Sequence, residues 1–339
     1  MSERIRIRNV YPFSDADKAL LEAVDPRFEW IHDGEDSTAW ADALVDPEVQ
    51  IISGSYAPSS LAGTPRLRWL STMGAGIDEL VHRDPWGLGV EVTNGSGLHA
   101  VHMAEFLLAG VLYASEKVAE RLANQAERAW DERRRGLFGR RLRGRRAVVV
   151  GYGSVGRETA RLLDAFGVAV TAVKQDPTRR ADTGWREAGT GDPDGTIPDR
   201  WAGPDELAAV VADAEYVLLT APATARSRGM IDARVLAAMR PDAWLLNVGR
   251  GALVDQPALI AALESGHLGG AWLDVTTPEP LPPDDPLWRA PRCVVAPHVS
   301  GAGDLDALWH QSALLLAEQL RRDAAGEPKL NVTSGSAGY

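Results

Sequence analysis

The chain has 339 residues, 45% of them hydrophobic and 24% charged, which excludes a wholly disordered protein. Its formal net charge of −11 argues against DNA or RNA as the main partner, because most of the surface would repel phosphate. The sequence holds no apolar run of about 18 residues and no secretory signal, so we expect no membrane partner. Cys293 is the single cysteine, which excludes an internal disulfide and favours a cytoplasmic location.

Short apolar runs alternate with helical patterns along most of the chain, as is typical of an α/β protein. In the first hundred residues, strands are expected at 5–10, 49–52, 68–71 and 90–93, and helices at 15–23 and 36–44. A longer helical pattern follows at 100–128. Its length suits a helix that braces two domains or packs against another subunit.

A second α/β series begins at Ala147. Strands are expected at 147–150, 168–173, 215–220, 243–248, 270–275 and 294–296, with helices at 155–166, 204–211, 232–239 and 255–264. Six strands joined by helical crossovers predict a doubly wound parallel sheet. The aperiodic segment 181–203 is expected to be an exposed loop, 305–322 a final amphipathic helix, and 333–339 a frayed end.

A glycine-rich turn follows the first strand of this second series and opens the next helix. The pattern Gly-x-Gly-x-x-Gly is weak evidence by itself, but a strand before it and a helix after it are the context that dinucleotide binding requires. The glycines allow a tight turn, a close approach of pyrophosphate to the backbone, and close packing of helix on strand. A βα turn that binds nothing is the weaker alternative. The expected contacts are Gly151, Tyr152, Gly153, Ser154, Val155 and Gly156.

The turn alone leaves FAD, S-adenosylmethionine and nicotinamide cofactors open. For NAD, the next strand should end in an acidic residue that binds the ribose hydroxyls. Here the strand is followed by Lys174, and Arg179 comes shortly after, so cations stand where a 2′-phosphate would be attracted. We therefore expect a preference for NADP. The alternative is that Lys174 is solvated and Asp176 binds the ribose of NAD.

Three side chains with useful chemistry follow three strands of the second series. Arg250 lies between two glycines after one strand, Glu279 follows the next, and His298 follows the last. Ligands of such sheets bind at the carboxyl ends of strands. Taken singly, each could be an ordinary loop residue. Together they suit the reduction of a 2-keto acid, in which His298 supplies a proton, Glu279 supports it and Arg250 grips the acid.

The motifs, taken in order, resemble those of the D-isomer-specific 2-hydroxyacid dehydrogenase family over residues 66–303. The likeness is specific because several separate motifs occur in the family's order. They are the glycine-rich turn at 151–156, the blocks at 220–224 and 228–231, and the arginine, glutamate and histidine motifs at 247–251, 274–280 and 297–301. Segment 71–78 is similar to the family's substrate loop, where consecutive backbone N–H groups could bind a carboxylate.

The resemblance implies two Rossmann- or flavodoxin-like domains with doubly wound parallel sheets. Residues 1–98 and 302–339 would form the substrate-binding domain, and 99–301 the inserted NAD(P)-binding domain. The catalytic set would be Arg250, Glu279 and His298, and the region 100–128 would build a homodimer. Substrate contacts would come from Met73, Gly74, Ala75 and Gly76. Further cofactor contacts would come from Thr220, Ala221, Pro222, Val248, Gly249 and Asp274, the last facing the nicotinamide carboxamide.

Three positions depart from the family's pattern. Lys174 replaces the acidic residue of NAD-using members, Thr220 stands where many relatives have histidine, and Ser300 where relatives often have glycine. The expected function is an NADP-preferring reductase of small 2-keto acids, of the glyoxylate or hydroxypyruvate type, with no metal. Another interpretation is a corepressor-like protein that senses nicotinamide dinucleotides without significant turnover. A relative acting on formate or phosphite is a third, which no residue here favours.

Overall fold

The structure is a computed structural model of the chain, and it describes residues 4–33, 46–54, 60–77, 80, 82–130 and 136–335. The chain folds into two compact units. The first consists of Met1–His99, Thr183–Ala188 and Ala302–Tyr339, and the second of Ala100–Asp182 and Gly189–Gly301. The second unit is therefore inserted into the first. The substrate and cofactor roles expected for the two parts of the chain stay predictions.

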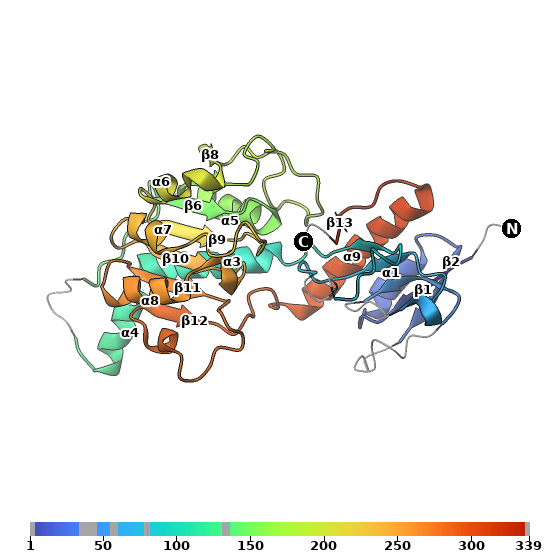
Figure 1. Cartoon of the computed structure of the whole chain (residues 1–339), viewed down its shortest axis with the longest axis horizontal. Coiled ribbons are helices and arrows are strands. Elements are labelled where there is room, and N and C mark those ends of the chain that lie inside the picture. Colours follow the sequence, from blue (N-terminus) through green and yellow to red (C-terminus); the bar gives the residue numbers. More distant parts are fainter. Residues whose placement is uncertain are drawn as a thin grey trace. The chain divides into compact units, whose positions relative to one another are not determined.

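The first unit is built on a six-stranded sheet (Figure 1). Its strands are β1 (Ile5–Asn9), β2 (Phe28–His32), β3 (Val49–Ser53), β4 (Trp69–Ser71), β5 (Glu91–Thr93) and β13 (Val332–Thr333), in the order β13-β5-β4-β3-β1-β2. The helices are α1 (Asp15–Glu22), the 3-10 turn η1 (Leu61–Gly63) and α9 (Leu305–Ala325). The five parallel strands have the flavodoxin-like order, and only β13 runs antiparallel, at the edge.

Both faces of this sheet are covered by apolar side chains. On one face, Ile7, Ile51 and Trp69 pack with residues of α1 and α9. On the other, Ile52 and Leu70 belong to a second cluster. A sheet buried on both faces requires near-continuous apolar strands, which explains why these runs could be identified in the sequence.

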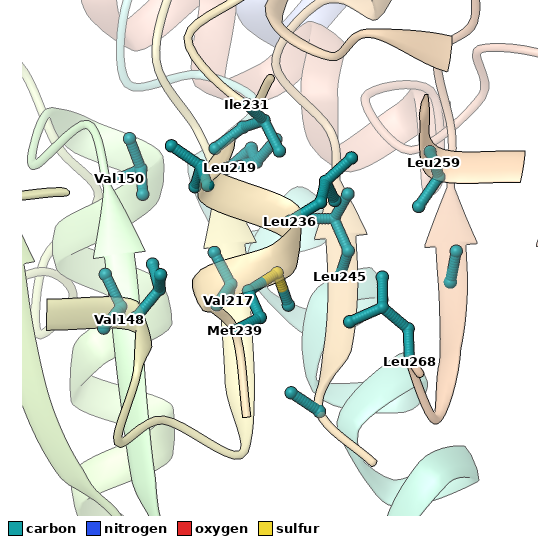
Figure 2. Close-up of a cluster of buried hydrophobic side chains, with 14 of the residues drawn as sticks. Val148, Val150, Val217, Leu219, Ile231, Leu236, Met239, Leu245, Leu259 and Leu268 are labelled. Carbon is teal, nitrogen blue, oxygen red and sulfur yellow. The ribbon is translucent and has the colours of Figure 1, made fainter. Parts of the chain in front are cut away.

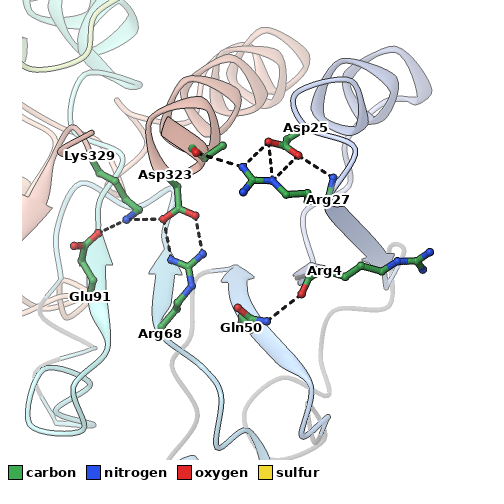
Figure 3. A network of polar contacts seen from close by, with 9 residues as sticks. Arg4, Asp25, Arg27, Gln50, Arg68, Glu91, Asp323 and Lys329 are labelled. Atoms are coloured by element: carbon green, nitrogen blue, oxygen red, sulfur yellow. Dashed lines mark hydrogen bonds and ion pairs between the residues drawn. The ribbon is translucent and has the colours of Figure 1, made fainter. Parts of the chain in front are cut away.

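A charged network ties the end of α9 to the sheet of the first unit (Figure 3). Asp323, on α9, accepts hydrogen bonds of 2.8 and 2.7 Å from Arg68, which precedes β4. The Lys329 ammonium lies 3.0 Å from Asp323 and 2.8 Å from Glu91 of β5, and 4.8 Å from the centre of the Trp69 ring. Burial opposes ionisation of Asp323, but the hydrogen bonds from Arg68 and Lys329 outweigh it and lower its pKa.

The second unit contains a seven-stranded, fully parallel sheet. Its strands are β6 (Arg146–Val150), β7 (Ala169–Val173), β8 (Arg200–Ala202), β9 (Tyr216–Leu219), β10 (Trp244–Asn247), β11 (Gly270–Leu273) and β12 (Cys293–Val295). The helices are α3 (Ala100–Ser115), α4 (Val118–Ala126), α5 (Ser154–Ala165), α6 (Leu207–Val211), α7 (Ala233–Ala238) and α8 (Gln256–Glu264). Short 3-10 turns are η2 (Pro204–Glu206), η3 (Gly251–Leu253) and η4 (Pro286–Arg289).

The strand order β12-β11-β10-β9-β6-β7-β8 is that of a dinucleotide-binding Rossmann sheet with one strand added beside β11. Alternate residues of each strand face opposite sides. Val148 of β6 packs with α6, α7 and α8 in the cluster of Figure 2, whereas Val149 packs on the other face with α3 and α5. The predicted α/β class with two doubly wound sheets is confirmed.

Several predicted elements differ from the observed ones. The single helix expected at 100–128 is two helices, α3 and α4, because Lys117 adopts a left-handed backbone with φ of 56°. The Arg140 backbone N–H donates to the Ser115 carbonyl, which in a continuous helix would accept from a later N–H of that helix. Strands β2, β8 and β13 were not predicted. Strands β8 and β13 are only three and two residues long, which is too short for a sequence pattern, and only their hydrogen bonds to a neighbouring strand identify them.

The helix expected at 36–44 lies outside the described residues. Thr333, the first residue of the segment expected to fray, instead belongs to β13. The described helices are all too short or too polar to span a bilayer.

Candidate active site

The expected site residues of the second unit follow neighbouring parallel strands. Gly151 follows β6, Thr220 follows β9, Arg250 follows β10, Glu279 follows β11 and His298 follows β12. Since these five strands are adjacent in the order β12-β11-β10-β9-β6, their carboxyl ends share one edge of the sheet. The fold therefore brings together, at one edge, residues separated by more than a hundred positions in the chain.

The glycine-rich turn has the shape that a phosphate requires. Gly151 has φ of 96°, and a Cβ there would strike the backbone of Ala221, so only glycine fits. Thr220 donates through its hydroxyl to the Gly151 carbonyl at 2.5 Å, which fixes the turn against the end of β9. Gly153 precedes α5 without any side-chain cap, and a Cβ there would meet nothing within 4 Å. Open space therefore lies beside an uncapped helix N-terminus, and these residues fit a dinucleotide pyrophosphate.

Not every side chain of the turn faces this space. Tyr152 is buried and donates its hydroxyl to Asp192 at 2.8 Å, and burial with this bond raises its pKa. Val155 packs against the core on the α5 side. A ligand would therefore contact these two residues through the backbone. Gly156 packs against the Gly151 carbonyl, so a side chain there would separate helix from strand.

The end of β7 carries the residues expected to select between NAD and NADP. Lys174 is half-buried and donates to the Arg179 carbonyl at 2.8 Å, while the Arg179 side chain is exposed. Burial and the charge of Arg157 lower the pKa of Lys174. Asp176 accepts from the Thr178 hydroxyl at 2.6 Å and from the Thr178 N–H at 3.0 Å, on one carboxylate oxygen, which lowers its pKa.

Backbone contacts join the loops that follow β9, β10 and β11. A Cβ on Gly249 would strike the Ala221 carbonyl, and one on Gly251 would strike the Thr276 carbonyl. Pro222 lies in the loop after β9, and its carbonyl accepts a hydrogen bond from the Ser227 hydroxyl. Val248, the first residue after β10, is buried. The two glycines of the arginine motif thus let Arg250 sit between neighbouring loops, which a larger residue on either side would prevent.

Arg250 is held by its own turn. The Asn247 amide donates to the Arg250 carbonyl at 3.0 Å and accepts from the Gly249 N–H at 3.0 Å. The Arg250 guanidinium donates to the Gly249 carbonyl at 2.9 Å. Asn247 was not among the predicted site residues, although its place directly before the arginine motif is a signal that could have identified it.

His298 and Glu279 form a direct pair. The Nδ1 atom of His298 lies 2.8 Å from Oε2 of Glu279, and Oε1 of Glu279 accepts from the Thr276 N–H at 3.0 Å. The side chains are 48% and 37% exposed, so a ligand can reach them. Because Glu279 engages Nδ1, the opposite ring nitrogen, Nε2, is the one available for proton exchange.

Asp274 supports the loop that carries His298. It is buried, its carbonyl accepts from the His298 N–H, and its two carboxylate oxygens accept from the N–H groups of Val299 and Ser300 at 2.7 and 3.1 Å. The Ser300 hydroxyl donates to the same carboxylate at 2.5 Å. These bonds hold His298 in a left-handed backbone with φ of 56°. The family resemblance implied a nicotinamide contact for Asp274, which stays a prediction, and the sequence did not reveal this supporting role.

The expected substrate loop lies in the first unit. Met73 donates its N–H to the Tyr11 hydroxyl at 2.8 Å, and Gly74 donates to the Thr72 hydroxyl at 3.3 Å. Asn94 donates to the Ala75 carbonyl at 2.8 Å. Within the described part of the chain, the backbone N–H groups of Ala75 and Gly76 have no hydrogen-bond partner. The substrate contacts expected of residues 73–76 stay predictions. Tyr11 was missed because its hydroxyl comes from a strand end that is distant in the sequence.

No group of three His, Cys, Asp or Glu side chains that could hold a metal occurs among the described residues. The chain was also compared with known proteins. Residues 108–300 match the model of the D-isomer specific 2-hydroxyacid dehydrogenase family, NAD binding domain. The expected NAD(P) class of cofactor, which the glycine-rich turn alone left open, is therefore confirmed.

Two curated relatives and one solved structure illustrate the likeness. The chain is 30% identical over 313 residues to D-3-phosphoglycerate dehydrogenase of Mycobacterium leprae, covering 91% of this chain and 54% of that protein. It is 29% identical over 277 residues to glyoxylate reductase of Korarchaeum cryptofilum, covering 81% and 77%. A D-isomer specific 2-hydroxyacid dehydrogenase from Xanthobacter autotrophicus Py2, solved with NADPH and MES, aligns over 100% of both chains with a TM-score of 0.78 and 28% identity. The chain spans about half the length of the phosphoglycerate dehydrogenases it matches.

Proposed function

The chain belongs to the D-isomer specific 2-hydroxyacid dehydrogenase family, as its motifs predicted, and we propose that it is an NAD(P)-dependent oxidoreductase that reduces a small 2-keto acid to the D-2-hydroxy acid. One observation carries this proposal: His298 and Glu279 are paired at 2.8 Å on the sheet edge that also carries the glycine-rich turn. Glyoxylate and hydroxypyruvate are the substrates we expect, and the name of the Korarchaeum relative supports the first of them.

Each residue has a distinct task in this reaction. A bound nicotinamide cofactor supplies the hydride. His298, through Nε2, gives a proton to the carbonyl oxygen during reduction and takes it back during oxidation. Glu279 orients the ring through Nδ1 and stabilises the charged imidazole. The Arg250 guanidinium, a planar fork with five N–H donors, binds the substrate carboxylate and polarises the carbonyl, and its bond to Gly249 orients it for this task.

The same geometry supports a proposal for the residues that hold the cofactor. The backbone around Gly153 and the first turn of α5 would bind the pyrophosphate. We propose NADP as the preferred cofactor, since the Lys174 ammonium carries three N–H donors and only one is used on the Arg179 carbonyl. Asp176 is the residue that would bind the ribose of NAD, and its engagement by Thr178 supports the same preference.

A panel of 2-keto acids assayed with NADPH and NADH tests the proposal. We expect steady turnover of glyoxylate or hydroxypyruvate, faster with NADPH. His298→Ala should lower kcat by about 10²- to 10⁴-fold, the usual contribution of a positioned proton donor, with cofactor affinity nearly unchanged. Arg250→Ala should raise KM for the keto acid and lower kcat. His82→Ala, an exposed histidine of the first unit, is the matched control and should leave both parameters unchanged.

A binding protein that senses nicotinamide dinucleotides is the alternative. It would bind NADPH tightly and turn over none of the acids, and mutating His298 would then have no measurable effect on its behaviour. Retention of arginine, glutamate and histidine at one edge favours the enzyme, because a sensor has no need for a proton donor paired with a carboxylate.

We also propose a homodimer formed through the region 100–128. Helix α4 has no buried residue, and its Leu122 is 52% exposed. Just beyond this region, Trp130 and Phe138 are 85% and 67% exposed. Exposed apolar groups of this size favour a protein contact. Light scattering of the intact chain and of Leu122→Arg would test it, and a wild-type monomer would refute it. A cytoplasmic location rests on the single cysteine and stays a prediction.

A further inference from the structure

A single buried arginine joins the two ends of the long loop that follows β7. Arg157, directly after the last glycine of the turn, is 2% exposed. One end of its guanidinium donates to the Asp192 carbonyl and the other to the Arg180 carbonyl at 2.6 Å. Beside it, the Asp182 backbone N–H donates to the Pro193 carbonyl at 2.8 Å. The stretch between Arg180 and Asp192 is therefore a loop whose two ends are both hydrogen-bonded to the Arg157 side chain.

The same guanidinium is linked to the glycine-rich turn. It lies 5.0 Å from the centre of the Tyr152 ring, and the Tyr152 hydroxyl donates to the Asp192 carboxylate at 2.8 Å. Because Tyr152 belongs to the turn and Arg157 to the first turns of α5, the loop after β7 is fastened to the elements that would hold the pyrophosphate.

Two cations hold successive carbonyls of the cofactor-selecting segment. Lys174 donates to the carbonyl of Arg179, and Arg157 to that of Arg180. Burying a guanidinium is unfavourable unless its donors are used, and among the described residues the buried Nε atom of Arg157 has no acceptor. An apolar side chain would fill the same space without that penalty. The charge of Arg157 also reaches Lys174, whose pKa is lowered by burial and by Arg157, against the opposite influence of Asp182. Positive charge is thus concentrated where the strand after the turn ends.

We propose that Arg157 is a positioning residue for cofactor selection: it holds the backbone of Arg179 and Arg180 so that Lys174 and Arg179 recognise a 2′-phosphate. The inference rests on the proposed preference for NADP and assigns that preference to a residue that does not itself touch the phosphate. NADH, which lacks the phosphate, would depend little on Arg157.

The test measures dissociation constants of NADPH and NADH by fluorescence titration, without turnover. Arg157→Met removes both bonds, and Arg157→Lys keeps the charge but replaces the two-nitrogen fork by a single nitrogen. Arg234→Met is the matched control, because Arg234 is an exposed arginine of α7 in the same unit and lies outside the loop 180–192. For the Arg157 variants we expect the NADPH constant to rise about tenfold or more, the NADH constant to change less than about twofold, and the control to match wild type.

The outcomes separate the two proposals. If wild type shows no NADPH preference and Lys174→Met changes neither constant, the NADP proposal fails and this inference fails with it. If wild type prefers NADPH and Lys174→Met abolishes the preference, but the Arg157 variants keep it or weaken both cofactors equally, only this inference is overturned.

A measurement on wild type covers the case in which both variants fail to fold. Amide hydrogen exchange at 176–192 should slow more with 2′,5′-ADP than with 5′-ADP, and equal protection by the two would contradict a link between this loop and the phosphate.

Discussion

Replacing Asp323 by Asn should destabilise the first unit by about 2–3 kcal/mol at neutral pH. Removing one partner of a buried charge pair costs about 3–5 kcal/mol. Here Asp323 is 7% exposed but Arg68 is 39% exposed, so solvent compensates part of the loss. Among the described residues, Lys329, which is 10% exposed and held over Trp69, would keep only Glu91 as its anionic partner (Figure 3).

The effect should depend on pH with a definite sign. The pKa of Asp323 is lowered in the folded chain, so its contribution is present above the unfolded value of about 4 and is lost as pH falls through the lower folded value. The difference between wild type and Asp323→Asn should therefore be constant near pH 7 and shrink below about pH 4.

Urea unfolding read by hydrogen exchange of peptides from α9 and β4 reports on the first unit alone, which matters because two units need not unfold together. Glu91→Gln is the control and should change the free energy of unfolding by less than about 1 kcal/mol, since Glu91 is 41% exposed. Equal stability of wild type and Asp323→Asn at pH 7, or a gap that persists unchanged in acid, would refute the reasoning.

Three further outcomes are expected. Glu279→Gln keeps a hydrogen-bond acceptor for His298 but removes the negative charge. The kcat for reduction should therefore fall by about 5- to 30-fold, which is equivalent to about 1–2 kcal/mol for a half-exposed charged hydrogen bond. An unchanged kcat would contradict the role of the pair. Gly251→Ala forces a Cβ onto the Thr276 carbonyl and should lower stability by about 2–4 kcal/mol in thermal unfolding, and an unchanged midpoint would show that the two loops can separate freely. Burial raises the pKa of the Cys293 thiol to about 12. A disulfide reagent at pH 8 should therefore modify the folded chain slowly and the urea-unfolded chain fast, and equal rates would show that the thiol lies at the surface.

The elements that could be predicted are those whose signal is local. Strands β6, β7, β9, β10 and β11 are apolar runs buried on both faces, and the helices between them begin at capping residues such as Asp232 and Asp255, whose side chains accept from the helix backbone. The glycine-rich turn was found for the same reason, because a strand, three glycines and a helix are adjacent in sequence. The strand-end positions of Arg250, Glu279 and His298 follow from parallel strand order, so their meeting at one edge was also open to prediction.

What the sequence determined by itself was therefore the alternation of strand and helix, the nucleotide-binding turn and the side chains available at the sheet edge. Tertiary structure alone decided how the loops of the site are held. Asp274 accepts hydrogen bonds from backbone N–H groups 25 and 26 positions away in the sequence, and Arg157 donates to carbonyls 23 and 35 positions away. It also decided the break at Lys117, where a distant N–H takes a helix carbonyl. Periodicity reports which face of an element is buried, whereas a hydrogen bond between remote segments exists only once folding has brought its donor and acceptor together.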